Sequence, residues 1–402
     1  MDLFPDQQHA LDLAARSRLF ILTGAAGTGK STAVRAILDA LSVPTERYFL
    51  AAPSGKAAKR LSEVSGRPAV TIHRLLKPIR EGKHFVFTRG PDNRIPADLI
   101  VLDEVSMVDV SLMARFLEAV APGTRLIFVG DPYQLPSVGP GNVLRDFLAS
   151  GVIPAAELTI IKRQDEGLLI RNCHRIKSGE DIHVDNAKTG DFYFLEQDTE
   201  EAIQAKIVEL TTKSLPASRG FDPMHDIQVI SPFRERTTLS CKAINEKLQQ
   251  ALNTNPALDN CRFRLGDKVI QQKNDYENDI VNGDIGYVER IEQALRRIEV
   301  RFENPDRLVK LDLFQNHLEL AYCLTIHKSQ GSEWPAVIIP IHSTFGSLML
   351  HRNLLYTAVS RAKKLCVIVG QREEIPKIVA RAGQENRYTG LAGLLSRRDE
   401  TP

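Results

Sequence analysis

Hydrophobic positions along the chain fall into short continuous runs separated by amphipathic segments. Four runs have the length of buried strands, namely Leu19–Leu22, Arg47–Ala52, Leu99–Leu102 and Leu126–Val129. After the first run, apolar residues recur at the i, i+3, i+4 and i+7 spacing of one helix face, at Val34, Ile37, Leu38 and Leu41. Similar helical spacing follows at Ala57–Val64 and Ser111–Val120. Strands that alternate with helices predict a parallel α/β sheet.

A second alternation of the same kind begins after Ser150. It consists of a strand at Ile227–Ile230, a helix that ends near Leu252, a strand at Val337–Ile341, a helix near Asn353–Arg361 and a strand at Leu365–Val369. The pattern therefore predicts two similar α/β lobes in one chain.

Two stretches do not fit the alternation. Between Lys77 and Ala97, His84–Thr88 is typical of a strand and Gly90–Asn93 of a turn, which predicts a β-hairpin inserted in the first lobe. Residues 263–320 contain several short β-type runs and predict a small β-barrel inserted in the second lobe. The expected domains are thus 1–155 for the first lobe, with 156–262 and 321–402 as the two parts of the second.

Composition adds little beyond the class of protein. The length of 402 residues favours two or three domains, and 25% charged and 43% hydrophobic residues are ordinary globular values. No apolar run approaches the roughly 18 residues of a membrane span, and no signal pattern precedes the first strand, so we expect a soluble cytoplasmic protein with no membrane partner. Five cysteines without a CxxC pair argue against a disulfide framework and a structural zinc site. A net charge of +2 does not by itself predict a nucleic-acid partner.

The clearest chemical signal is GAAGTGKST, from Gly24 to Thr32, which fits the phosphate-binding pattern GxxxxGK[ST] between a strand and a helix. Its glycines allow main-chain N–H groups to surround a polyphosphate, and the helix N-terminus adds positive charge. Lys30 is expected to reach the β- and γ-phosphates and Ser31 to bind Mg²⁺. The nucleotide-binding set is Gly24, Gly27, Thr28, Gly29, Lys30, Ser31 and Thr32.

Acidic and amide residues follow two later strands. Asp103 and Glu104 end one strand, where Asp103 is expected to hold Mg²⁺ and Glu104 to orient or deprotonate the attacking water. Asp131 and Gln134 follow the next strand and are expected near the γ-phosphate. Because ligands of parallel sheets bind beyond the carboxyl ends of strands, these residues and Gly24 should meet at one edge.

Eight motifs in this order resemble those of superfamily 1B DNA helicases, and most closely the RecD-like branch. They are GAAGTGKST, AAPSGKAAKRL, TIHRLL, LDEVSM, GDPYQLPSVGPG, LTIIKRQ, LTIHKSQGSEWP and LLYTAVSRAKK, and the resemblance extends from about Gln7 to Gly370. It implies two RecA-like P-loop lobes, with the hairpin as a strand-separating pin and the β-rich insert as an SH3-like domain. Only 23 residues precede Gly24, so we expect a compact, Dda-like architecture without the N-terminal domain of many relatives.

The resemblance also implies roles for residues that the spacing alone leaves open. Gln7 matches a glutamine that binds adenine, and Glu333 an acidic residue near the ribose. Arg163 and Arg361 match two arginines that the second lobe offers to the γ-phosphate, a role that suits a planar guanidinium. Without the motifs, an exposed polar residue would be the alternative for Gln7 and a surface charge the alternative for each arginine.

Contacts to single-stranded DNA are implied at a further set of positions. These are Pro53, Ser54, Lys56, Thr71 and His73 in the first lobe and Thr325, His327 and Lys328 in the second, with Phe85 or Phe87 of the hairpin able to stack on a base. The alternatives are ordinary core histidines, and aromatic rings packed inward as hairpin core.

The sequence thus favours an ATP- and Mg²⁺-dependent 5′ to 3′ DNA helicase that binds single-stranded DNA and duplex junctions. We expect it to be monomeric and to act with replication, repair or recombination proteins. One alternative is an ATP-gated DNA-binding or remodelling subunit that does not unwind DNA alone. A second is a P-loop kinase of a small substrate. RNA stays open as a substrate, because backbone contacts do not themselves distinguish the sugar.

Overall fold

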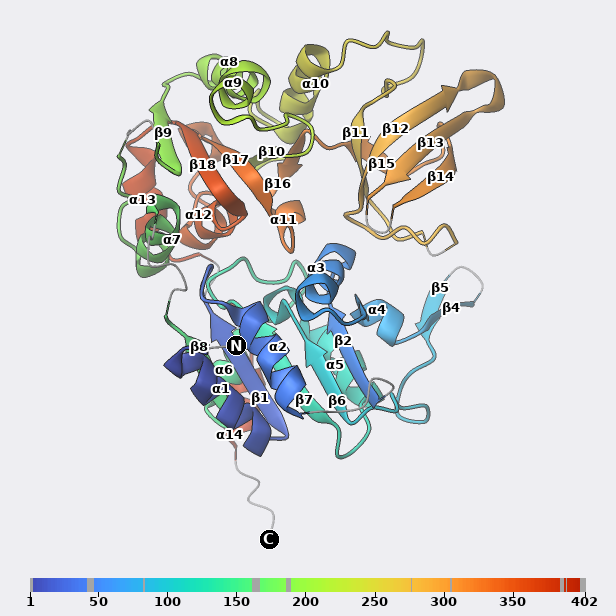
Figure 1. Cartoon of the computed structure of the whole chain (residues 1–402), viewed down its shortest axis with the longest axis vertical. Coiled ribbons are helices and arrows are strands. Elements are labelled where there is room, and N and C mark those ends of the chain that lie inside the picture. The colour runs from blue at the N-terminus through green and yellow to red at the C-terminus, as the bar shows by residue number, and fades with distance from the viewer. Residues whose placement is uncertain are drawn as a thin grey trace. The chain divides into compact units, whose positions relative to one another are not determined.

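The computed structural model describes residues 3–41, 47–81, 84–160, 167–185, 189–275, 277–303, 306–383, 387 and 389–397, with backbone alone at 80, 81, 84 and 85. The chain forms two compact units, residues 1–165 with 384–402 and residues 166–383 (Figure 1). No helix in the described part of the chain is both long and apolar enough to cross a bilayer.

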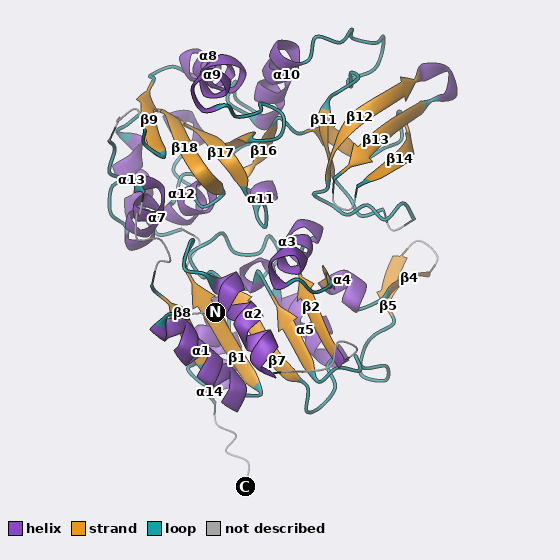
Figure 2. Ribbon diagram, in the orientation of Figure 1, coloured by secondary structure: helices purple, strands orange, loops and turns teal. Residues whose placement is uncertain are grey.

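The first unit is built on a six-stranded parallel sheet in the order β3-β2-β6-β7-β1-β8 (Figure 2). Its strands are β1 (Leu19–Gly24), β2 (Tyr48–Ala52), β3 (Ala69–Thr71), β6 (Leu99–Leu102), β7 (Arg125–Gly130) and β8 (Ala155–Leu158). The continuous apolar runs are explained by burial on both faces. Phe20 and Leu22 of β1 pack into one core cluster and Ile21 into another.

Helices and short turns connect these strands. They are α1 (Pro5–Arg16), α2 (Lys30–Leu41), α3 (Gly55–Ser65), α4 (Ile72–Leu75), η2 (Val105–Met107), α5 (Val110–Ala119) and α6 (Val143–Ser150). Residues of α1, α2 and α3 contribute to one core cluster and residues of α5 and α6 to the other. The sheet is therefore covered by helices on both faces.

The stretch between Lys77 and Ala97 contains a hairpin whose turn differs from the predicted one. Strands β4 (Pro78–Glu81) and β5 (His84–Phe87) pair antiparallel and are joined by residues 82–83, which lie outside the described residues. The turn signal at Gly90–Asn93 forms a separate tight turn, in which Gly90 and Asn93 exchange backbone hydrogen bonds of 3.2 Å. A strong turn signal thus marked a real turn that does not close the hairpin.

The last helix of the chain, α14 (Leu391–Ser396), belongs to the first unit. Leu391 and Leu395 pack against the core cluster that includes residues of α6. Arg387 donates to the carbonyl oxygens of Ser137, Gly139 and Gly141 at 2.7–2.8 Å. The sequence placed residues 321–402 in the second lobe, whereas the structure groups residues 384–402 with the first unit.

The second unit contains a five-stranded parallel sheet in the order β16-β10-β17-β18-β9. Its strands are β9 (Phe192–Glu196), β10 (Ile227–Ser231), β16 (Cys323–Thr325), β17 (Trp334–Ile341) and β18 (Ala362–Gly370). Its helical segments are α7 (Leu168–Ser178), α8 (Glu200–Glu209), η3 (Leu210–Ser214), α9 (Leu215–Arg219), α10 (Cys241–Leu252), α11 (Ile326–Ser329), η5 (Ser343–Phe345), α12 (Arg352–Val359) and α13 (Glu374–Ala380). The predicted α/β class with two parallel sheets is therefore confirmed.

The β-rich insert of the second unit is a five-stranded antiparallel sheet in the order β14-β13-β12-β11-β15. It comprises β11 (Lys268–Gln271), β12 (Ile285–Glu292), η4 (Gln293–Leu295), β13 (Arg297–Phe302), β14 (Arg307–Asp312) and β15 (Leu318–Leu320). Val269, Val288, Val300 and Phe302 lie in its own core cluster. The insert therefore has a hydrophobic core distinct from those of the α/β sheets.

A buried polar network attaches the insert to α10. Asp267 is completely buried and accepts hydrogen bonds from Gln249 Nε2, Asn253 Nδ2 and the Tyr322 hydroxyl at 2.5, 2.7 and 2.9 Å. Because a buried carboxylate is costly unless it is hydrogen-bonded, these donors fix the junction in one arrangement. Next to it, burial lowers the pKa of the Lys268 ammonium to about 8.

The buried Lys268 predicts a pH dependence of stability. The unfolded chain keeps this proton up to the ordinary pKa of 10.5, whereas the folded chain releases it near 8, so the unfolded state binds more protons between these values. The free energy of unfolding, measured by urea denaturation, should rise by about 2 kcal/mol between pH 7.5 and 10 relative to Lys268→Met. Parallel pH curves for the two proteins would contradict burial of a charged Lys268.

Candidate nucleotide and nucleic-acid site

The phosphate-binding loop joins β1 to α2. Gly27 and Gly29 have φ angles of 81° and 82°, a region that favours glycine. A β-carbon at Gly24 would lie 2.5 Å from Thr28 Oγ1, so this position also requires glycine. Lys30 Nζ folds back over the loop and donates to the carbonyl oxygens of Gly24 and Ala25 at 2.6 and 3.1 Å. The loop thus holds an ammonium beside the N-terminus of a 12-residue helix, an arrangement suited to anions.

The acidic pair lies at the end of β6. Glu104 has φ 52° and ψ 41°, a left-handed conformation that a non-glycine residue rarely adopts and that is frequent at functional sites. Its N–H donates to Asp103 Oδ1 at 2.8 Å. Burial, and after it the charge of the neighbouring Glu104, raise the pKa of Asp103 to about 6, while Arg60 and Lys30 oppose the shift. Arg60, which the sequence analysis did not single out, therefore acts electrostatically on this carboxylate.

Two polar residues after β7, Asp131 and Gln134, are buried. Asp131 is fully buried and accepts the N–H of Tyr133 at 3.0 Å, and Gln134 Nε2 lies 3.5 Å from Asp131 Oδ2. Gln134 Oε1 is buried and has no hydrogen-bond partner among the described residues. A buried acceptor without a partner is unusual in native proteins and points to a ligand or a water molecule.

Strand register brings the three loop regions to one sheet edge. β7 pairs with β1 on one side, with Thr23 opposite Gly130, and with β6 on the other, with Leu102 opposite Phe128. The segments that follow Gly24, Leu102 and Gly130 therefore leave the sheet side by side. This is the convergence that the sequence predicted.

Gln7 is only 1% exposed, so the alternative of an exposed polar residue is wrong. Its Oε1 accepts the Phe4 N–H at 3.2 Å, and its buried Nε2 has no partner in the described part of the chain. The side chain is thus fixed at one end and has an unused donor at the other. An unused amide donor of this kind fits an acceptor nitrogen of adenine.

The candidate arginines of the second unit differ in what the structure describes. Arg361 is 2% exposed and donates to Thr357 O, Ser332 O and Ser360 Oγ at 3.0–3.2 Å, so the alternative of a surface charge is wrong. Arg163 lies outside the described residues. Glu333 lies 3.9 Å from Lys363 Nζ, and its role near a ribose stays a prediction.

Two sets of candidate DNA contacts have the same construction, and we call them the threonine modules: Thr71 with His73 in the first unit, and Thr325 with His327 and Lys328 in the second. Thr71 is the last residue of β3, and its hydroxyl accepts the Arg74 N–H at 3.1 Å. Thr325 is the last residue of β16, and its hydroxyl accepts the Lys328 N–H at 3.3 Å. Both threonines have closely similar backbone angles, φ −73° and ψ 152° against φ −71° and ψ 151°. Each module begins at the edge strand of its sheet and carries a histidine after a buried isoleucine.

Other candidate contacts are placed as follows. Ser54 caps α3 by accepting the Ala57 N–H at 3.3 Å, and Pro53 and Lys56 lie half-exposed beside it. Burial lowers the pKa of His73, whose ring lies 5.9 Å from that of Phe87. Phe87 itself packs against the core of the first unit, which favours the inward alternative for this ring. The Phe85 side chain lies outside the described residues.

The fold and the loop define a P-loop nucleotide-binding protein with two parallel α/β sheets. Three family models match it: an AAA domain over residues 2–192, an ATP-dependent RecD-like DNA helicase SH3 domain over 244–302, and a UvrD-like helicase C-terminal domain over 320–369. The RecBCD enzyme subunit RecD of Mycolicibacterium smegmatis is 32% identical over 423 residues, which cover 96% of this chain and 74% of that protein. The chain therefore belongs to the RecD-like family of superfamily 1 helicases.

Two further similarities define the extent of the match. The ATP-dependent RecD2 DNA helicase of Deinococcus radiodurans is 36% identical over 396 residues, which cover 97% of this chain but 52% of the relative, so the chain spans about half of that protein. The crystal structure of a Pif1 helicase from Bacteroides superposes with a TM-score of 0.58 at 21% identity, covering 94% of each chain. At this identity the structural similarity establishes the shared fold.

The geometry of the phosphate loop and the acidic pair predicts different effects for two substitutions. If Glu104 orients or deprotonates the attacking water, Glu104→Gln should lower ATP hydrolysis by about 100-fold, yet retain ATP binding. Lys30→Ala should lose both binding and hydrolysis, because it removes the ammonium from the loop. Turnover by phosphate release and affinity by a fluorescent ATP analogue are the measurements.

Glu63→Gln is a matched control for Glu104→Gln, because Glu63 is an exposed carboxylate on α3 paired with Lys59 at 2.9 Å. It should behave as the wild type in both assays. Wild-type turnover in Glu104→Gln would show that another group activates the water.

Proposed function

We propose that this chain is an ATP-dependent DNA motor that translocates on single-stranded DNA, 5′ to 3′, and separates duplex strands. The observation that carries the proposal is the meeting of three features at one sheet edge. These are the phosphate loop with Lys30, the Asp103–Glu104 pair and the buried Gln134 amide with its unused acceptor. Membership of a helicase family supports the same activity.

The donor set of the site suits ATP with Mg²⁺. The Ser31 hydroxyl and the Asp103 carboxylate are hard oxygen ligands of the kind that Mg²⁺ prefers. The ion would neutralise charge on the β- and γ-phosphates when bound. A bound triphosphate gives the Lys30 ammonium a charged partner in place of two carbonyl oxygens. Glu104 then accepts a proton from, or orients, the attacking water, and Gln7 binds the adenine edge.

The two threonine modules support binding to the DNA backbone without sequence readout. Thr71 and Thr325 each carry a hydroxyl at the first turn of a short helix, and Lys328 adds positive charge in the second module. Hydroxyls and ammonium groups bind phosphates of any sequence, as a translocating protein requires. Because these contacts do not read the sugar, the preference for DNA rests on the names of the relatives.

A second candidate function is that of an ATP-gated DNA-binding subunit that does not unwind DNA alone. The observation that favours it is the Mycolicibacterium smegmatis relative, which is named as a subunit of the RecBCD enzyme. Purified chain that hydrolyses ATP with DNA yet unwinds no duplex would support this second function. The kinase alternative lacks support, because the family models that match are those of an AAA domain and of helicases.

The proposed motor predicts which nucleic acids stimulate ATP hydrolysis. A poly-dT oligonucleotide should raise ATP turnover by about tenfold or more, and the same length of poly-U should raise it less. Duplexes with a 5′ single-stranded tail should be unwound, whereas duplexes with only a 3′ tail should stay intact. Turnover that no nucleic acid changes would overturn the proposal, and a preference for 3′ tails would overturn the polarity alone.

The hairpin of β4 and β5 is our candidate for the element that separates strands. Replacing residues 80–85 with an Asn-Gly turn should lower the unwinding rate about tenfold, because it shortens the hairpin that we propose as the strand-separating element. DNA-stimulated ATP turnover should stay within about twofold of the wild type. Asp92→Ala in the separate Gly90–Asn93 turn is the control and should unwind normally. Unchanged unwinding in the shortened protein would assign strand separation to another surface.

A further inference from the structure

A cavity of about 490 Å³ lies in the second unit, where α10 meets the β-rich insert. Its walls come from the loop after β10, from α10 and the segment that follows it, from the β11 and β15 region of the insert, and from β16 and α11. Two of the candidate DNA contacts, Thr325 and Lys328, line it. The cavity therefore adjoins the threonine module of this unit.

Positive charge predominates around the cavity. Three glutamates line it, against five basic side chains, which are Arg234, Lys242, Arg262, Arg264 and Lys328. These cations come from four different segments of the chain. Such a grouping favours an anionic ligand.

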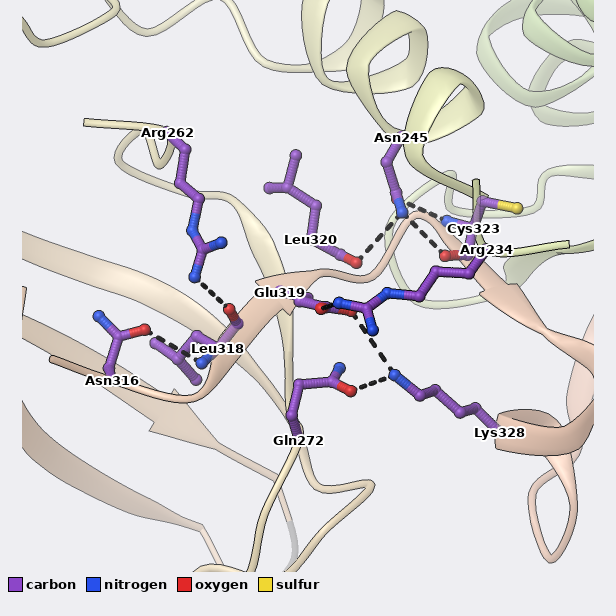
Figure 3. Close-up of polar contacts among 10 residues, drawn as sticks. All are labelled: Arg234, Asn245, Arg262, Gln272, Asn316, Leu318, Glu319, Leu320, Cys323 and Lys328. Atoms are coloured by element: carbon purple, nitrogen blue, oxygen red, sulfur yellow. Dashed lines mark hydrogen bonds and ion pairs between the residues drawn. The ribbon is translucent and has the colours of Figure 1, made fainter. Parts of the chain in front are cut away.

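One carboxylate holds two of these cations. Glu319 of β15 contacts Arg234 Nη2 through Oε1, and its Oε2 lies 3.5 Å from Lys328 Nζ (Figure 3). The Arg234 side chain is 62% exposed, so water screens the pair and its net contribution to stability is small. Glu319 thus occupies the position that a phosphate of a bound strand would take, and a phosphate can displace it at little cost.

Gln272 supplies a further donor at the same place. Its Oε1 accepts a hydrogen bond from Lys328 Nζ (Figure 3). Its Nε2 is buried and has no hydrogen-bond partner within the described residues. An unused amide N–H₂ beside two cations fits a phosphate oxygen.

The part of the cavity wall formed by α10, β11 and β15 has apolar side chains and amides that are already hydrogen-bonded. Asn245 donates to Leu320 O and Cys323 O at 3.2 and 3.0 Å and accepts the Cys323 N–H at 2.8 Å (Figure 3). Gln249 is committed to Asp267 and Arg262 O. Because these amides are already bonded, the wall cannot read the edge of a base, while Leu320 and Ile270 provide apolar contact.

We propose that this cavity is a nucleotide subsite for single-stranded DNA, an inference that rests on the proposed function. Arg234, Lys328 and Gln272 bind one phosphate, and the attached nucleoside enters the cavity without sequence readout. Glu319 is a competing anion that holds the two cations in place until the strand arrives. Binding a strand therefore exchanges an internal ion pair for phosphate contacts.

The test is the affinity for a fluorescent dT12 oligonucleotide, measured by anisotropy at several salt concentrations. Arg234→Ala should weaken binding about fivefold or more and reduce the slope of log affinity against log salt by about 0.7, the value for one lost phosphate contact. Glu319→Gln, which keeps the shape of the side chain, should tighten binding severalfold. Thermal melting should show both variants folded.

Arg290 and Glu292 provide matched controls on β12. They form an ion pair of the same kind at 2.6 Å, with Arg290 63% exposed, and neither lines the cavity. Arg290→Ala and Glu292→Gln should bind dT12 as the wild type does. If Arg234→Ala and Glu319→Gln match these controls, the subsite is wrong while the proposed function stands. If wild-type protein does not bind dT12 at all, both are wrong.

Entry of the nucleoside has its own measurement. Cys261 is half-buried and lines the cavity, so its alkylation by iodoacetamide reports on occupancy. Saturating dT12 should slow modification of Cys261 about tenfold, as quantified by mass spectrometry of its peptide. An unchanged rate under saturation would overturn entry of a nucleoside into the cavity.

Discussion

The parallel register of β1, β6 and β7 is the constraint on which the candidate ATP site depends. Parallel strands end at the same sheet edge, so the loops after Gly24, Leu102 and Gly130 are brought together by backbone pairing. The polar residues in those loops can then be buried and strained, because the sheet beneath them is rigid and apolar on both faces. The left-handed Glu104 and the buried Gln134 amide depend on that support.

The second unit repeats this construction at its own sheet edge. Its sheet is also parallel, and its edge strand β16 ends in the same threonine cap that ends β3 in the first unit. In both modules the buried isoleucine anchors the short helix and the cap fixes the threonine hydroxyl. The backbone angles of the two threonines agree to within a few degrees, so TIHRLL and TIHKSQ place their threonine hydroxyls in the same local geometry.

Much of this was predictable from the sequence, for physical reasons that also explain the exceptions. Long apolar runs and a phosphate loop are local signals, so the central strands and Lys30 were predicted. The three-residue strand β3 is too short to show a period, and the return of α14 to the first unit is a long-range packing event with no local signature. Burial of Gln7 and Arg361 likewise depends on tertiary contacts, which is why a surface position remained an alternative for each.

Two carboxylates where the β-rich insert meets the rest of the second unit, Asp267 and Glu319, differ in how firmly their contacts are held. The Asp267 carboxylate is buried and hydrogen-bonded to three side chains. Because breaking these bonds would leave a buried charge without partners, this contact between the insert and α10 is stable. At Glu319 the carboxylate is partly solvated and shared by two cations, so a competing anion can replace it at low cost. The hydrogen bonds of Asp267 keep the cavity wall in place, and the ion pairs of Glu319 leave Arg234 and Lys328 available to a ligand. The proposed motor would bind and release many successive phosphates, and it would need both arrangements.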